Sequence, residues 1–148
     1  MQDIQTIPST IQQLAHALLL HEADQKPEPE ELWMAIEHIY AKLQRRLAEL
    51  VGQTGFVALF SRALHLARRE TPVLAGISID PRLPNQLQGS QEFALAHPDD
   101  VITSFGRVVA HFIWLLVTFV GEQLSMNLIS DIWPQLNYDA TAHGGIQS

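Results

Sequence analysis

The hydrophobic and polar positions along this chain follow a helical period in four segments. Apolar residues recur at spacings of three and four, which gathers them on one side of an α-helix. The last segment is the most apolar, because no Asp, Glu, Lys or Arg occurs from Val108 to Gly121. We therefore expect an all-α fold, most simply a four-helix-bundle-like domain with a long, largely buried C-terminal helix. The four helices are expected at residues 9–22, 29–51, 56–70 and 98–133.

Proline and glycine residues mark the boundaries of these segments. Pro29, which two glutamates follow, is typical of the first turn of a helix. Gly52 and Gly55 bracket a short turn between the second and third helices. Residues 73–96 form a connection that is long for a compact domain, and we expect an extended piece and a helical turn within it. Pro134 ends the last helix.

The length of the chain suits one domain, because 148 residues can bury a sizeable core. We expect residues 1–138 to form a single all-α domain and residues 139–148 to form a flexible C-terminal tail. At about 1.5 Å per residue the last helix would be roughly 50 Å long, which is more than the first and third helices can cover. Either it kinks near Gly106 or Gly121, or its extra surface meets a second subunit. We expect a homodimer.

Composition and charge narrow the classes of partner. The formal net charge of −7 argues against nucleic acid, and the helix that follows Gly52 lacks the polar side chains of a DNA-reading helix. The chain contains no Cys, which excludes disulfides and thiolate metal sites and fits a cytoplasmic location. The first ten residues, MQDIQTIPST, lack the basic start and apolar core of a secretory signal, so that we expect none here. The uncharged run is shorter than the roughly 20 residues that span a bilayer. No membrane partner is therefore expected.

Sequence motifs for metal or covalent chemistry are missing. The seven His residues show neither the HExxH spacing of zinc enzymes nor the Glu-x-x-His spacing of di-iron bundles. Neither a nucleophile elbow nor a phosphate-binding glycine loop occurs. We therefore expect no metal, no cofactor and no catalytic residues, so that the protein is not an enzyme.

Six polar residues of the last helix fall within one arc of a helical wheel. This arc is either a strip that faces solvent or a polar seam that faces another helix or a ligand. Trp114 lies inside the arc and favours the seam, because a large aromatic is less expected on a solvent strip. The polar members are Ser104, Arg107, His111, Thr118, Glu122 and Ser125.

A candidate site follows from this arc and from the third helix. Glu122 needs a partner if it is buried, and the guanidinium of Arg62 matches a carboxylate well. We expect a Glu122–Arg62 ion pair that fixes the register of the two helices, with Thr118 one turn before Glu122 as a further hydrogen-bonding group. Together with His65 and His111, these residues are the candidates for ligand binding in a pocket between the third and fourth helices.

Two phrases of the sequence, GFVALFSRAL at residues 55–64 and LLVTFVGE at residues 115–122, resemble those of a bacterial all-helical domain of unknown function. Proteins like it occur as small stand-alone chains and beside signalling modules. The resemblance covers about residues 30–134 and brings no ligand or catalytic residues with it. It implies a bacterial origin and a regulatory or scaffolding role. We expect a non-enzymatic regulatory or protein-interaction domain of a bacterial signalling system, and the alternative is a small-molecule sensor.

Overall fold

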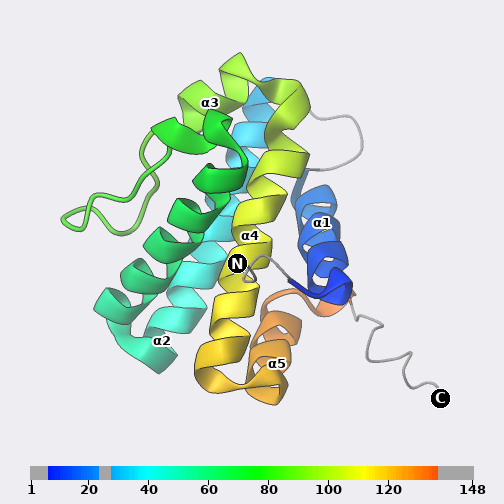
Figure 1. Ribbon diagram of the computed structural model, residues 1–148, viewed down its shortest axis with the longest axis vertical. Helices are drawn as coiled ribbons and strands as arrows, with labels where there is room; N and C mark the ends of the chain where they lie inside the picture. The colour runs from blue at the N-terminus through cyan, green and yellow to red at the C-terminus, as the bar shows by residue number, and fades with distance from the viewer. Residues whose placement is uncertain (1–6, 24–27, 137–148) are drawn as a thin grey trace.

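The computed structural model describes residues 7–23 and 28–136, and α-helices form most of this part of the chain (Figure 1). Its described residues contain no β-strand, apart from one isolated antiparallel bridge between Ser78 and Gln88. The prediction of an all-α, bundle-like fold is therefore confirmed. The predicted tail at residues 139–148 lies outside the described residues. The α-helices are α1 (Ser9–Ala23), α2 (Pro29–Glu70), α3 (Ser90–Ala96), α4 (Val101–Val120) and α5 (Glu122–Ile132).

Helix α2 is a hairpin of two helical arms that meet at Gly52. The backbone of Gly52 has φ 82° and ψ 161°, a conformation that is essentially restricted to glycine. Figure 1 shows the two arms side by side. Tyr40 of the first arm packs against the rings of Phe56 and Phe60 in the second, with centroid distances of 5.4 and 5.0 Å. The two separate helices expected on either side of Gly52 are therefore both present.

The prediction of a single long helix at residues 98–133 is wrong, because the chain breaks at Gly121 between α4 and α5. There φ is 98° and ψ is 157°, and α5 turns back beside the C-terminal end of α4 (Figure 1). Gly121 was one of the two positions expected for a kink, and the absence of a Cβ lets it adopt this backbone. The break takes up the extra length that suggested a second subunit. The homodimer thus stays a prediction without that argument.

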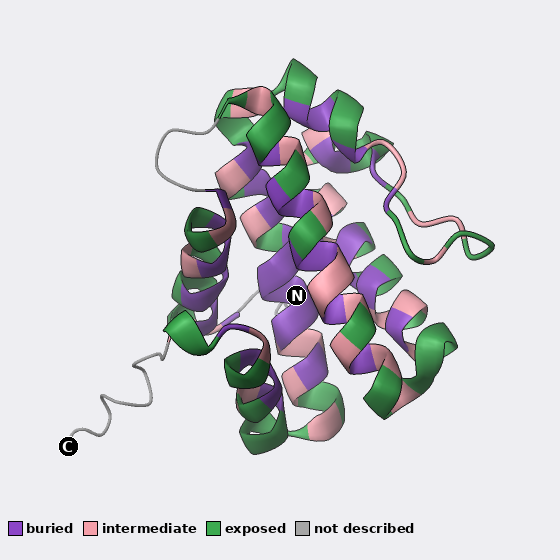
Figure 2. Cartoon of the chain, turned by 180° about the vertical axis from the view of Figure 1, so that it is seen from behind, coloured by how far each residue is buried: buried purple, intermediate pink, exposed green. Residues whose placement is uncertain are grey.

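Helix α4 lies at the centre of the fold, between α1 and the two arms of α2 (Figure 1). Figure 2 shows buried residues along most of its length. Phe112 of α4 packs against Phe56 and Phe60, with ring centroids 5.7 and 5.3 Å apart. Phe105, about two turns earlier on α4, adds to this aromatic cluster with its ring centroid 6.5 Å from that of Phe60. This cluster joins α4 to both arms of α2.

The helical stretch Pro98–Val120 is longer than its uncharged run suggested. By length and composition alone it could cross a membrane, although 56% of its most apolar stretch is buried inside the protein. A core helix passes the same test, because burial in protein and burial in lipid select similar side chains. The expectation of no membrane partner therefore stays a prediction.

The end of α5 is tied to the other helices through Glu22. The indole Nε1 of Trp133 donates a hydrogen bond of 2.8 Å to Glu22 Oε2, and Lys42 Nζ donates to the same oxygen. Burial alone would raise the pKa of Glu22, but the hydrogen bonds from Lys42 and Trp133 outweigh it and hold this pKa below its ordinary value. One carboxylate thus joins α1, α2 and the residue that follows α5.

The long connection between α2 and α3 is fixed to the body of the protein. Figure 1 shows it projecting beside the second arm of α2. Ser78 and Gln88 exchange two backbone hydrogen bonds of 3.0 and 2.8 Å, and the Tyr40 hydroxyl donates to Pro84 O at 2.7 Å. The extended piece and the helical turn expected here correspond to the bridge at Ser78 and to α3.

Candidate ligand-binding site

A cavity of about 260 Å³ opens between α1, α4 and the C-terminal end of α2. Gly106 and Ala110 of α4 line it, and these residues lie one helical turn apart on the same side of the helix. Their small side chains leave room beside the helix axis, while Ile7 and Ile102 add apolar surface. The polar lining residues are Gln12 and His16 of α1, Glu70 of α2, and Thr103, Arg107 and His111 of α4.

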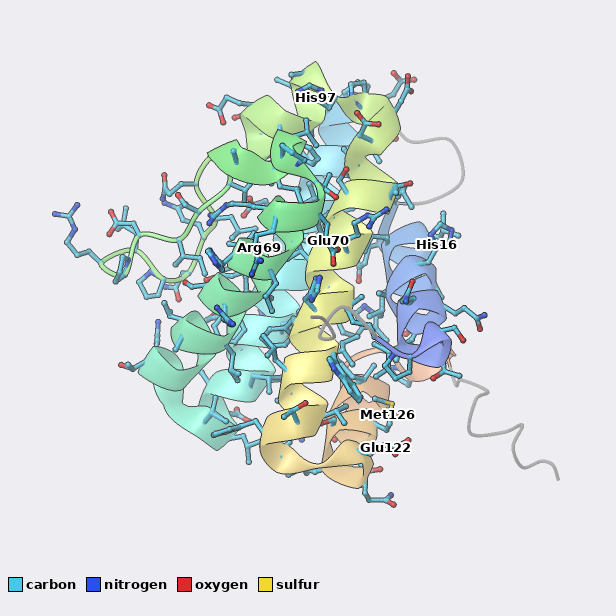
Figure 3. The ribbon with its side chains drawn as sticks, in the orientation of Figure 1. His16, Arg69, Glu70, His97, Glu122 and Met126 are labelled. Carbon is cyan, nitrogen blue, oxygen red and sulfur yellow. The ribbon has the colours of Figure 1, made fainter. Side chains whose placement is uncertain are left out.

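Glu70, Arg107 and His111 form a charged cluster in the wall of this cavity. Glu70 Oε1 lies 3.2 Å from His111 Nε2 and 3.6 Å from Arg107 Nη1. The His111 side chain is 5% exposed, that of Glu70 is 30% exposed and that of Arg107 is 49% exposed. Arg107 and His111 are four residues apart, so that both lie on the side of α4 that faces Glu70. Figure 3 shows Glu70 beside α4.

The position of Glu70 is unfavourable for its own helix. It is the last residue of α2, where the helix dipole disfavours a negative charge by about 0.3–1 kcal/mol. Arg68 and Arg69, which precede it, have the charge that this end of the helix prefers. Glu70 is thus unfavourable for its own helix, yet its carboxylate contacts a buried histidine. This combination is more typical of a functional site than of an ordinary helix end.

Of the five residues predicted to bind a ligand, only His111 lines this cavity. Arg62 and His65 are exposed on the second arm of α2. Thr118 is exposed, and its hydroxyl donates to Trp114 O at 2.9 Å within α4. These residues do not converge on the cavity, which lies farther toward the N-terminal half of α4 than the sequence indicated.

The predicted Glu122–Arg62 ion pair is not formed. Within the described ranges no salt bridge joins the two residues, and both side chains are exposed. The reason is the break at Gly121, which removes Glu122 from the face of α4 and places it in the first turn of α5 (Figure 3). The wheel that put Glu122 and His111 in one arc assumed a continuous helix.

The polar arc is therefore two surfaces. Ser104 and His111 are buried in the first eleven residues of α4, and His111 and Arg107 line the cavity. Thr118, nearer the C-terminus of α4, faces solvent. Ser125 belongs to α5, where its hydroxyl donates to Gly121 O at 2.7 Å. The two alternatives expected for the arc are therefore both present. The part of the arc near His111 is a polar seam, and the part near Thr118 is a strip that faces solvent.

Sequence reasoning missed Gln12, His16, Glu70 and Thr103 at the cavity. Gln12 and His16 lie one turn apart on α1, and Gln12 Nε2 also donates to Ile7 O at 2.8 Å. Only the fold brings α1 to α4, so their position in the sequence gave no signal. Glu70 did carry one, because an acidic residue in the last turn of a helix is out of place.

The comparisons with known proteins give this site no parallel. Neither the protein-family models, nor the curated proteins, nor the solved structures contain a match to this chain. The resemblance of residues 55–64 and 115–122 to a bacterial domain thus stays a prediction. Within residues 7–23 and 28–136, no group of three or more His, Asp or Glu side chains is arranged to hold a metal ion.

Proposed function

We propose that this protein is a non-enzymatic regulatory domain that binds a small molecule in the cavity between α1 and α4. The observation that carries the proposal is the cluster of His111, Glu70 and Arg107 in the wall of an open, partly apolar cavity. Ligand sites typically combine apolar surface with a few convergent polar groups. Buried His111 holds one end of this cluster, while half-exposed Arg107 extends it toward solvent.

The position of the cavity suggests how binding would regulate the protein. Gln12 and His16 of α1 line it together with Thr103 and Arg107 of α4, so a bound molecule would contact both helices. A ligand that binds only when α1 is packed against α4 stabilises that arrangement, by about 2.7 kcal/mol at a hundred times its Kd. The bound and free states would then differ in how firmly α1 is held, which a partner domain could sense.

A thermal-shift screen of metabolites tests the proposal. A ligand near saturation is expected to raise the Tm of a chain of this size by about 5–10 °C. Thr103→Trp places a bulky ring at the exposed rim of the cavity and is expected to abolish the shift. Thr118→Trp is the matched control, since Thr118 is also exposed on α4 but does not line the cavity, and it should keep the shift. No shift with any compound, or an equal shift in Thr103→Trp, would overturn the proposal.

Self-association is a second candidate role, and Phe119 favours it. This residue at the C-terminal end of α4 is 65% exposed, and Leu124 of α5 is 39% exposed. A second copy of the chain is the occupant we propose for this corner, because two apolar side chains can meet across a twofold axis without complementary charges. Light scattering should give the mass of a dimer for the wild type and of a monomer for Phe119→Ser. A monomeric wild type at high concentration would contradict the homodimer.

The cellular setting that we propose is a bacterial signalling system in the cytoplasm. It rests on the resemblance of residues 55–64 and 115–122 to a domain found beside signalling modules. The genes that neighbour this one test it. A neighbouring kinase or sigma-factor regulator would support the setting, and neighbours confined to metabolic enzymes would count against it.

A further inference from the structure

We infer that the ligand of the α1–α4 cavity is a free α-amino acid with an apolar side chain, an inference that rests on the proposed function. The cavity presents a carboxylate and a guanidinium next to each other, with apolar surface beside them. Each of the two charged groups keeps unused hydrogen-bonding capacity. The arrangement therefore suits a ligand that carries both charges on neighbouring atoms.

Glu70 can still accept a hydrogen bond from the ligand. Both of its contacts, from His111 Nε2 at 3.2 Å and from Arg107 Nη1 at 3.6 Å, are made to Oε1. Among the described residues no hydrogen bond reaches Oε2. An ionised carboxylate accepts hydrogen bonds through both oxygens, so Oε2 can accept a hydrogen bond from a ligand ammonium group.

Arg107 can still donate to a ligand. Its contact with Glu70 is made by one nitrogen at 3.6 Å, which is longer than a hydrogen bond, and its side chain is 49% exposed. The guanidinium carries five N–H groups in a plane and binds carboxylates best through two of them at once. A ligand carboxylate can therefore take this paired contact, and Thr103, one turn earlier on α4, lies beside it with a hydroxyl group.

The distance between the two charges selects the class of ligand. Arg107 Nη1 and Glu70 Oε1 are 3.6 Å apart, which matches the ammonium and carboxylate that an α-amino acid carries on one carbon. A simple carboxylic acid would place its charge near Glu70 without compensation, and a simple amine would do so near Arg107. Unmatched charge of this kind is how a site rejects related molecules.

The rest of the cavity favours a small apolar side chain. Ile7, Ile102 and Ala110 provide apolar surface next to the charged cluster. The volume of about 260 Å³ lies below the range of about 300–1,000 Å³ that is usual for drug-sized ligands. A single amino acid is of suitable size, and burying its side chain would add to affinity by about 25 cal/mol per Å² of apolar surface.

Calorimetric titration of the full chain with L-valine, L-leucine and L-phenylalanine tests the inference. At least one should bind saturably. For L-leucine the matched probes are 4-methylpentanoate, which lacks the ammonium group, and 3-methylbutylamine, which lacks the carboxylate. Each should bind weaker by about tenfold or more, because one charged partner in the cavity then loses its hydrogen bond.

Variants of the chain provide the second arm. Arg107→Gln and Glu70→Gln should each weaken amino-acid binding by about tenfold or more. Arg69→Gln is the control, because Arg69 is exposed next to Glu70 and does not line the cavity, and it should leave Kd unchanged. Circular dichroism should show the same helicity in all three variants, since Arg107 and Glu70 are both partly exposed.

The outcomes separate this inference from the proposed function. If the acid or the amine binds as tightly as the amino acid, or if Arg107→Gln binds it with unchanged affinity, the inference of a zwitterionic ligand is wrong. The proposal that the cavity binds a small molecule would then still stand. Failure of all three amino acids, while another metabolite gives a thermal shift that Thr103→Trp abolishes, would overturn the inference alone. If no compound binds in either assay, both are wrong.

Discussion

The carboxylate of Glu22 joins three parts of the fold through one oxygen. Trp133 Nε1 donates to Oε2 at 2.8 Å, Lys42 Nζ donates to the same atom, and the side chain is only 7% exposed. The pKa of Glu22 lies below its ordinary value of 4.5, because these hydrogen bonds outweigh the effect of burial. The ionised form therefore stabilises the folded state. This contribution is complete above about pH 4.5 and is lost as the pH falls through the lower pKa of the folded protein.

Glu22→Gln should lower the free energy of unfolding at pH 7 by about 1–3 kcal/mol, because the amide accepts hydrogen bonds more weakly than the carboxylate. The variant should also lose less stability than the wild type when the pH is lowered below 4.5. Urea denaturation at several pH values measures both effects. Glu49→Gln is the control, since its exposed pair with Arg46 should contribute less than about 1 kcal/mol. Parallel acid sensitivity in Glu22→Gln and the wild type would contradict the role of Glu22.

Tyr40 should resist ionisation in the folded protein. Burial, with a smaller effect from Glu37, raises the pKa of Tyr40 to about 12. Because the unfolded chain would ionise near the ordinary value of 10.0, stability should fall as the pH rises above it. Spectrophotometric titration of the wild type and Tyr40→Phe isolates this phenol. A phenolate at Tyr40 near pH 10 without unfolding would contradict the burial described here.

At the scale of the elements, the break between the two arms of α2 and the break between α4 and α5 each depend on a glycine, and the two glycines have nearly the same backbone conformation. Gly52 has φ 82° and ψ 161°, and Gly121 has φ 98° and ψ 157°. A Cβ at either position would meet no atom within 4 Å, so only backbone strain opposes a side chain there. We therefore expect the conformation of these two glycines, and not their packing, to determine the effect of substitution.

Gly52→Ala and Gly121→Ala should each lower the free energy of unfolding by about 1–3 kcal/mol. Gly106→Ala provides a control of opposite sign. Gly106 lies inside α4, a Cβ there meets no atom within 4 Å, and alanine should stabilise the helix by about 0.5–1 kcal/mol. Thermal and urea unfolding of the three variants measure these differences. Equal effects at all three positions would show that the breaks do not depend on the glycine backbone.

These glycines also show what the sequence could and could not predict. The paired Gly52 and Gly55 interrupt the apolar period, and the turn there was expected. Gly121 lies inside a run whose apolar residues continue on both sides, so the periodicity predicted one helix where α4 and α5 are two. Helical segments depend on local spacing and could be located well, but the direction of the chain after Gly121 depends on packing.

The candidate site was predicted only in part for the same reason. Arg107 and His111 could be placed together because they are four residues apart on one helix. Glu70 and His16 come from other helices, and no spacing in the sequence relates them to α4. Glu122 was placed with His111 only because the wheel was continued past Gly121.

At the scale of the whole molecule, the fold surrounds one apolar helix and leaves one side of it incompletely covered. Both arms of α2 and the aromatic cluster around Phe112 cover α4 on one side. On the side of α1, the small residues Gly106 and Ala110 leave a cavity that charged groups line. The central claim of our account is that this cavity is the place where the protein binds a ligand.

A two-dimensional NMR titration of the uniformly ¹⁵N-labelled chain tests this claim most directly, because it locates binding without any substitution. The compound that gives the largest thermal shift is added stepwise, and the backbone amide shifts are followed. Our account predicts saturable shifts centred on Gln12, His16, Glu70 and residues 102–111. Shifts that saturate elsewhere, with these amides unchanged, would contradict it.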